Sequence, residues 1–361
     1  MTKAAELAKM GEVLTNSQIG GRRNIIMNGA MQVAQRSTSE TGVFDASQYE
    51  TLDRFKINGS TSGRATMTQT ADGPSGFANC LKLACTTADT SIASGEFGII
   101  RYLIEGQDLQ QIKKGTSDAE KVTISFYVKG NANATYQLEF KDGDNNRVNA
   151  QTFNVTTSWN RIILTFDADT TGAFDDDNAA SVQLNFWLHA GSTYTSGTFT
   201  SNTWQDGSAS DGIRVGSITS FFDSTDRTFF LTGLQMEVGE QATPFEHRSF
   251  GEELALCQRY YNVIERANGN VHGLVGYVHT TSSCMYPLHK TMRTTPSMTN
   301  TNFQILYAGT TTVNISSISS IIAENCIVGF KLNCSGTPLT IGEATMLSAN
   351  GDSKLEFSAD L

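Results

Sequence analysis

Three aromatic residues stand in a stretch of sequence that has few other apolar residues to form a core around them. They are Tyr194, Phe199 and Trp204, within residues 190–212 (AGSTYTSGTFTSNTWQDGSASDG). Polar side chains follow closely at Asn202, Gln205 and Asp206. A glycan site needs an exposed aromatic face for the sugar ring and polar groups for its hydroxyls. The stretch is therefore a candidate glycan-binding loop; the alternative is that it folds over its own domain or packs on a neighbouring subunit.

Motifs typical of enzymes do not fit this sequence. Residues 73–77 are Gly-Pro-Ser-Gly-Phe, which departs at its last position from the GxSxG of a nucleophile elbow. KKGTS at 113–117 has the wrong order for a phosphate loop, and the five histidines show no metal-ligand spacing such as HExxH. A glycosidase needs only two suitably placed carboxyl groups, and the chain has 36 acidic residues. We expect a protein that is not an enzyme and has no cofactor, with a carbohydrate-active enzyme as an open alternative.

Two acidic clusters offer the oxygen ligands that calcium prefers. Asp142, Asp144 and Asn146 alternate as in a calcium loop, but Arg147 stands where a glycine is expected. The second cluster is the DDDN run at 175–178, together with Asp167 and Asp169 just upstream. We interpret the first cluster as a hairpin tip and the second as a solvated loop, and we predict no bound metal.

The six cysteines form no CxxC pair, so a zinc site is not expected. Because the N-terminus lacks the apolar segment of a secretion signal, we expect the chain to fold in a reducing cytoplasm. The cysteines are then predicted to be small buried thiols rather than disulfides. They are Cys80, Cys85, Cys257, Cys284, Cys326 and Cys334.

The elements that would position these residues are strands. Segments with the two-residue period recur every ten to fifteen residues from Arg22 onward, without long helices between them. An Asn-Gly turn at Asn28-Gly29 precedes the first strand, and a short helical turn at 108–113 interrupts the series. The chain also has only five prolines and is rich in glycine, serine and threonine. This pattern predicts an all-β protein whose main domain, residues 21–248, is a jelly-roll β-sandwich.

The periodicity changes twice between Phe229 and Ile264. A strand over 229–238 is followed by a stiff connection containing Pro244, and the spacing of apolar residues after Ser249 is then helical. We predict a linking helix at 249–265 and a smaller β domain at 266–361.

The N-terminal residues 1–20 can form a short helix with apolar residues on one side. Those residues are Ala4, Leu7 and Ala8, with Leu14 at the end of the segment. A helix this short is marginal alone and needs a partner. We interpret it as a docking peptide, and a frayed terminus is the alternative.

Charge and hydropathy exclude two classes of partner. The net charge of −10 argues against a nucleic-acid-binding surface, which needs a basic face. No apolar run approaches the length of about 18 residues that a membrane span requires.

Four blocks carry a resemblance that covers about residues 1–265. They are NIIMNGAMQVAQR (24–36), TLDRF (51–55), EGQDLQQIKKGTSDAEKVTISFYVKG (105–130) and FFLTGLQMEVGEQATPFEHRSFGEELALCQRYY (229–261). In this order they resemble a group of bacteriophage virion structural proteins described as tail fibre or tail-associated proteins, especially in phages of marine bacteria. NIIMNGAM and the strand order also resemble carbohydrate-binding modules of the jelly-roll type.

The resemblance implies a virion protein that is assembled in the host cytoplasm and presents β domains to host-surface glycans as part of a tail fibre. It also implies docking on other virion proteins through the N-terminus, and a homotrimer by analogy with fibres. The alternatives are a head fibre or capsid decoration protein, and a carbohydrate-active enzyme or its binding module.

Overall fold

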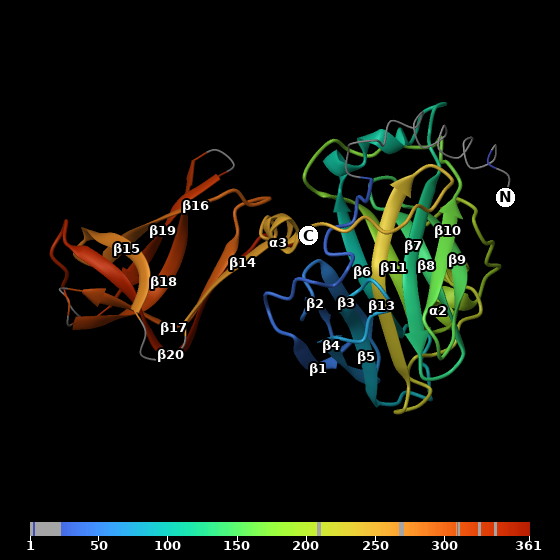
Figure 1. Cartoon of the computed structure of the whole chain (residues 1–361), viewed down its shortest axis with the longest axis horizontal. Helices are drawn as coiled ribbons and strands as arrows, with labels where there is room; N and C mark the ends of the chain where they lie inside the picture. The colour runs from blue at the N-terminus through green and yellow to red at the C-terminus, as the bar shows by residue number, and fades with distance from the viewer. Residues whose placement is uncertain are drawn as a thin grey trace. The chain divides into compact units, whose positions relative to one another are not determined.

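Alternating apolar side chains build the first part of the chain as two facing antiparallel sheets (Figure 1). The computed structural model describes residue 3 and residues 23–361, apart from 208–210, 267–270, 308, 310, 324–325 and 336–337. The chain divides into two compact units, residues 1–253 and 254–361. The predicted docking residues Ala4, Leu7, Ala8 and Leu14 lie outside the described residues.

One sheet of the first unit has six strands. In spatial order they are β1 (Ser39–Val43), β4 (Arg64–Thr70), β5 (Cys80–Thr87), β13 (Thr228–Val238), β7 (Val122–Gly130) and β10 (Asn160–Phe166). The facing sheet has seven: β12 (Gln205–Asp206), β9 (Arg147–Val155), β8 (Ala134–Asp142), β11 (Ala180–Ala190), β6 (Phe97–Glu105), β3 (Phe55–Ser60) and β2 (Ser47–Tyr49). Neighbours in both sheets are antiparallel, so the predicted all-β sandwich is confirmed.

Aromatic rings fill the space between the sheets. Phe126 of β7 meets Phe153 of β9 and Phe186 of β11 edge-on, with ring centroids 5.1 Å apart in both pairs. All three side chains are buried. Such contacts between facing strands join the two sheets into one core.

The NIIMNGAM segment forms the predicted turn but not the strand expected after it. The Asn28 side chain accepts a hydrogen bond from the Val33 N–H and donates to the Val33 and Asp53 carbonyls. The backbone N–H and carbonyl of Val33 are therefore hydrogen-bonded to Asn28, and the first strand begins only at Ser39. Gly29 is needed because a Cβ there would lie 2.1 Å from the Leu234 carbonyl oxygen of β13.

Helical structure in the described residues of the first unit is short. The 3-10 turns η1 (Gly106–Asp108) and η2 (Gln110–Ile112) follow β6, as the sequence predicted for 108–113. Helix α2 (Ser192–Thr195) and the 3-10 turn η3 (Asp211–Ile213) lie in the long connection after β11. No helix of the described residues is long and apolar enough to cross a membrane.

The linking helix is shorter than predicted. Helix α3 (Phe250–Cys257) ends in a turn where the Tyr260 N–H donates to the Cys257 carbonyl. Residues Tyr261–Arg266 then form strand β14, which pairs with Ser353–Ser358. The helical spacing of Tyr260, Tyr261 and Ile264 was misleading because partners in a distant strand, rather than the local pattern, decide their conformation.

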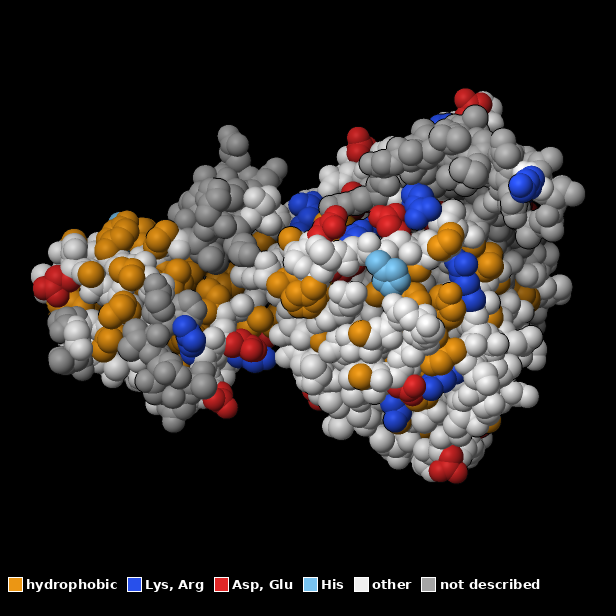
Figure 2. Space-filling model, in the orientation of Figure 1, with side chains coloured by type: hydrophobic (Ala, Val, Ile, Leu, Met, Phe, Trp, Pro, Cys, Tyr) orange, Lys and Arg blue, Asp and Glu red, His pale blue; other side chains and the backbone are white. Residues whose placement is uncertain are grey.

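The second unit is a closed β structure. Its further strands are β15 (Val271–Thr280), β16 (Ser283–Lys290), β17 (Ser297–Tyr307), β18 (Thr311–Ala323), β19 (Cys326–Cys334) and β20 (Ala344–Ser358). The order is β14-β20-β15-β16-β19-β18-β17, and β17 also pairs with β20, which closes a six-stranded barrel. Exposed apolar side chains in this unit include Val275, Tyr277 and Ile341, and Figure 2 shows apolar surface on it.

The cysteines agree with the prediction of buried thiols. Five are free and buried: Cys80, Cys85, Cys257, Cys284 and Cys334. The side chain of Cys326 lies outside the described residues.

Candidate functional site

The outer face of the seven-stranded sheet carries a row of polar side chains that the strand register brings together. Asn185 of β11 stands opposite Glu139 of β8 on one side and Arg101 of β6 on the other. Directly opposed residues point to the same face of a sheet, so the three side chains meet. Arg101 donates from Nε to the Asn185 amide oxygen at 2.8 Å.

Glu139 is the centre of this row. Its carboxylate is fully buried and accepts hydrogen bonds from Asn185 (2.7 Å) and from the Trp187 indole (3.2 Å). Arg214, from the connection after β11, donates two hydrogen bonds to the same carboxylate, at 2.8 and 2.9 Å. Its guanidinium also lies 5.2 Å from the centroid of the Trp187 ring. The connection is thereby anchored to the outer face of the sheet.

The environment keeps Glu139 ionised. Burial acts to raise the pKa of this carboxyl, but the Arg214 charge and the donated hydrogen bonds outweigh burial and hold the pKa below its usual value. A buried carboxylate is tolerated here because it is paired and its oxygens accept several donors.

The same connection makes further contacts with this face. Gln137, two residues before Glu139 and thus on the same face, donates to the Arg214 carbonyl (2.7 Å) and accepts from the Gly216 N–H (2.8 Å). Trp187 and Ile99 form a small buried cluster with Val215. The described residues of 190–218 therefore fold over their own domain, which was the alternative to an exposed glycan-binding loop.

The structure places the three predicted aromatic residues in different surroundings. Tyr194 of α2 packs against Trp187, with centroids 5.1 Å apart, on the outer face. Trp204 meets Phe140 of the inner core at 5.2 Å and donates from its indole to the Asp167 carbonyl at 2.7 Å. Both are half-buried. Tyr194 and Trp204 thus pack on opposite faces of the sheet and do not form one aromatic surface for a sugar.

Phe199 lines a pocket. It is half-buried, and its ring lies so close to Gly216 that a Cβ there would come within 2.9 Å of it. The pocket has a volume of about 390 Å³. Its lining residues are Ala190, Thr195, Gly197, Phe199, Val215, Gly216, Ser217 and Ile218. One aromatic ring therefore shares a concave site with hydroxyl and backbone groups.

Two of the acidic residues considered for calcium are engaged by a lysine. Lys114 places its ammonium 2.6 Å from Asp142 and 3.1 Å from Asp169, and both carboxylates are buried. The same ammonium donates to the carbonyls of Thr171 and Gly172. Asp142 ends β8, at the hairpin to β9, as predicted for this segment.

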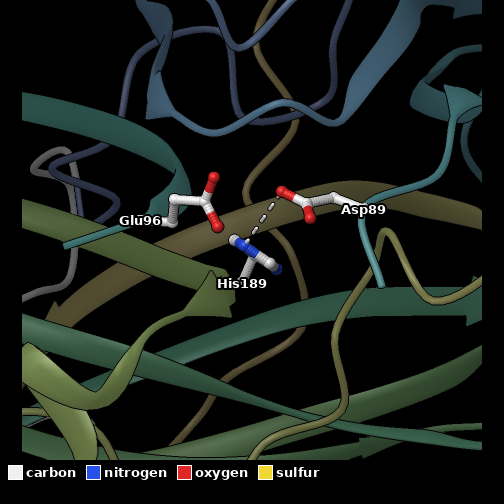
Figure 3. A group of neighbouring side chains, drawn as sticks. All are labelled: Asp89, Glu96 and His189. Atoms are coloured by element: carbon white, nitrogen blue, oxygen red, sulfur yellow. Dashed lines mark ion pairs between the residues drawn. The ribbon is translucent and has the colours of Figure 1, made fainter. Parts of the chain in front are cut away.

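A further cluster joins residues that are far apart in the sequence. Asp89 follows β5, Glu96 directly precedes β6, and His189 belongs to β11. Each offers one ligand atom, and these atoms all lie within 4.8 Å of one another (Figure 3). Burial lowers the pKa of His189 although the two carboxylates act to raise it, which favours the neutral imidazole.

Sequence reasoning missed most of this site. Arg214 and the pocket residues 215–218 lie in a segment without strand or helix periodicity, so nothing marked them. Glu139 and His189 occupy strand positions where polar residues normally face solvent. A polar residue alternating with apolar ones on β8 and β11 was the available signal, and it cannot tell a covered outer face from an open one.

Comparison with known proteins finds similarity of architecture at low identity. No protein-family model and no curated protein matches the chain. A tailspike protein 4 domain of bacteriophage CBA120 is 13% identical with a TM-score of 0.31, over 60% of this chain and 21% of the tailspike. The family 11 carbohydrate-binding module of a Clostridium thermocellum cellulase is 12% identical with a TM-score of 0.28, over 59% of this chain and 99% of the module.

A third solved structure is TmCBM61 in complex with β-1,4-galactotriose. It is 8% identical with a TM-score of 0.29, over 60% of this chain and 99% of the module. The chain spans only about a fifth of the tailspike. Scores this low establish neither a shared family nor a shared function.

The Glu139–Arg214 pair predicts a pH-dependent stability. Arg214→Gln leaves the buried carboxylate without its charge partner, so we expect the free energy of unfolding at pH 7 to fall by about 3 kcal/mol. Since the folded pKa of Glu139 lies below the usual 4.5, its ionised form contributes stability above that pH and loses it as pH falls through the folded value. The difference in the free energy of unfolding between Arg214→Gln and the wild type should therefore become smaller below pH 4.5.

Urea unfolding followed by tryptophan fluorescence measures the free energy of unfolding of the first unit, because Trp159, Trp187 and Trp204 all lie in it. Lys113→Gln, which removes an exposed pair with Glu120, is the control and should cost under about 1 kcal/mol. If Arg214→Gln lowers the free energy of unfolding by the same amount at pH 7 and at pH 4, the role assigned to the Glu139–Arg214 pair is wrong.

Proposed function

We propose that the chain is a structural protein of a phage virion, a component of the tail fibre, that binds host-surface glycan without cleaving it. The observation that carries the binding function is the pocket beside Phe199. The order of the four resembling blocks in the sequence supports the virion role.

The pocket has the properties that sugar binding requires. Its volume of about 390 Å³ lies within the range of about 300–1,000 Å³ typical of small-ligand sites. The Phe199 ring offers an apolar face, and Thr195 and Ser217 offer hydroxyls for hydrogen bonds. The walls are fixed in advance, since Gln137 holds Gly216 and the Gly197 N–H donates to the Gly212 carbonyl at 2.8 Å. A preformed site loses less entropy on binding.

Binding rather than hydrolysis suits the composition of the pocket. Glycosidases use a pair of carboxyl groups that flank the scissile bond. Among the described residues that line the pocket there is no Asp, Glu or His. The proposal is therefore a binding function, and a carbohydrate-active enzyme is the competing one. Release of reducing sugar from a host polysaccharide by the purified chain would favour the enzyme.

Phe199→Ala should weaken glycan binding at least about fivefold, because a stacked aromatic ring contributes on the order of 1 kcal/mol or more. The measurement is an array of bacterial surface polysaccharides and soluble oligosaccharides, followed by calorimetry on the best ligand. Phe250→Ala is the matched control, since that phenylalanine is 56% exposed on α3 and lines no part of the pocket. The proposal fails if Phe199→Ala binds as the wild type does, or if the wild type binds nothing on the array.

Deleting residues 1–20 should abolish incorporation into virions while leaving the sandwich folded. We propose that Leu7 and its apolar neighbours in this segment dock on a tail or tail-adaptor protein. Immunogold labelling of particles that carry the full-length chain should mark the tail. Label on the head would support a head fibre or decoration protein instead, and normal incorporation of the truncated chain would refute the docking role.

The purified chain should be a homotrimer, with a mass of three times 39.1 kDa, or about 117 kDa, by light scattering. Trimerisation multiplies weak sugar contacts through avidity. Apolar surface is available for it: Val275 and Tyr277 share one face of β15, and both are about half exposed. Val275→Lys should then lower the mass, whereas Ile163→Lys, at an equally exposed position on β10, should not. A wild-type monomer at micromolar concentration would contradict the trimer.

A further inference from the structure

The imidazole of His189 points toward the space between the carboxylates of Asp89 and Glu96 (Figure 3). The three residues belong to two separate regions: the loop between β5 and β6 supplies both acids, and β11 supplies the histidine. His189 is fully buried, Asp89 is 4% exposed and Glu96 is half-buried. The group is therefore an enclosed cluster with one side near the surface.

One nitrogen of His189 is fixed and the other has no partner. Nδ1 lies 2.8 Å from the Ser220 hydroxyl, whereas Nε2 is buried without a hydrogen bond. Nε2 is 4.0 Å from the nearer Asp89 oxygen, too far for a direct bond. A hydrogen bond at one ring nitrogen sets which tautomer presents its lone pair at the other. If Nδ1–H donates to Ser220, the free lone pair of Nε2 faces the two acids.

The carboxylates are also held in place. Thr61 donates to Asp89 at 2.6 Å, and the Ala93 N–H donates to Glu96 at 2.6 Å. Hydrogen bonds from Thr61 and Ser62 outweigh the effect of burial and keep the pKa of Asp89 below its usual value. Among the described residues, neither acid has a lysine or arginine ion-pair partner. Two carboxylates and a lone pair that converge without a cation leave an uncompensated negative site.

We propose that Asp89, Glu96 and His189 bind one divalent transition-metal ion, for which Zn²⁺ is the best match. Imidazole nitrogen together with carboxylate oxygen is a ligand set for zinc and its neighbours, whereas calcium and magnesium prefer oxygen ligands alone. Three protein ligands leave a fourth position for water on the side of the half-buried Glu96. No sequence motif marks this site, because its ligands are separated by up to 100 residues.

The ligands need only a small closure to reach a metal. If the three atoms stood at the corners of an equilateral triangle of side 4.8 Å, its centre would lie about 2.8 Å from each, against about 2.0–2.2 Å for zinc–nitrogen and zinc–oxygen bonds. Glu96 sits in a connection rather than in a strand, so its side chain can close this gap.

Metal binding would stiffen the neighbourhood of the Phe199 pocket. The Gly191 N–H donates to the Glu96 carbonyl at 2.7 Å, and the Thr193 N–H donates to the Ser94 carbonyl at 2.9 Å. These bonds attach the β5–β6 loop to α2, whose Thr195 lines the pocket. An ion that joins this loop to β11 would therefore fix one wall of the pocket.

The test is calorimetric titration of ZnCl₂ into the full-length chain after removal of metals with EDTA. We expect one ion per chain, and a rise in the unfolding temperature with added zinc because the ion binds only the folded state. Glu96→Gln, which changes a half-buried side chain without changing its size, should weaken zinc binding at least tenfold, and His189→Gln should abolish it. Co²⁺ bound in the same site should give the visible absorption of a low-coordinate complex, and Glu96→Gln should lose it.

Two variants control for non-specific binding at exposed side chains. Asp118→Asn and His279→Gln remove an exposed acid and an exposed histidine elsewhere, and they should bind zinc as the wild type does. The proposal is overturned if the wild type binds no zinc at 100 μM, if Glu96→Gln binds it unchanged, or if Ca²⁺ binds more tightly than Zn²⁺. None of these outcomes depends on glycan binding, so the metal site and the glycan pocket are tested independently of each other.

Discussion

The buried ion pair between Glu139 and Arg214 is the interaction on which the candidate site depends. A carboxylate at the centre of a sheet face is costly unless charge and hydrogen bonds compensate it. Here the compensating charge comes from the connection after β11, so satisfying Glu139 requires that connection to lie across the sheet. The polar group thereby determines the path of a segment whose regular structure is limited to short helical turns and a two-residue strand.

This constraint explains why the centre of the seven-stranded sheet is buried on both faces. Its inner face packs on the six-stranded sheet through rings such as Phe186, and its outer face is covered around Trp187 and Val215. The covering segment leaves a hollow next to Phe199 rather than a flat surface. A recognition site made in this way combines the rigidity of strands with the variability of a connection, which is how binding surfaces on β-sandwiches are commonly built.

The sandwich contains two kinds of buried acidic cluster. At Asp142 and Asp169 the Lys114 ammonium lies where a metal ion would have to bind, and backbone carbonyl oxygens accept its other hydrogen bonds. At Asp89 and His189 no lysine or arginine of the described residues does so. The contrast between two acidic clusters in one domain distinguishes a site closed by the chain itself from one that is open to an ion.

The sequence by itself determined the all-β class, the sandwich body, a second β unit and the turn at Asn28-Gly29, because two-residue periodicity and turn residues act locally. It did not determine that Tyr194 and Trp204 serve opposite faces of one sheet, or that the helix after Ser249 stops at Cys257 so that Tyr261 can pair with Ser358. Nor did it bring together Glu139 with Arg214 or Asp89 with His189. Only tertiary structure decided these, since register and the path of a connection depend on partners dozens of residues away, and alternation along a strand does not reveal what covers its outer face.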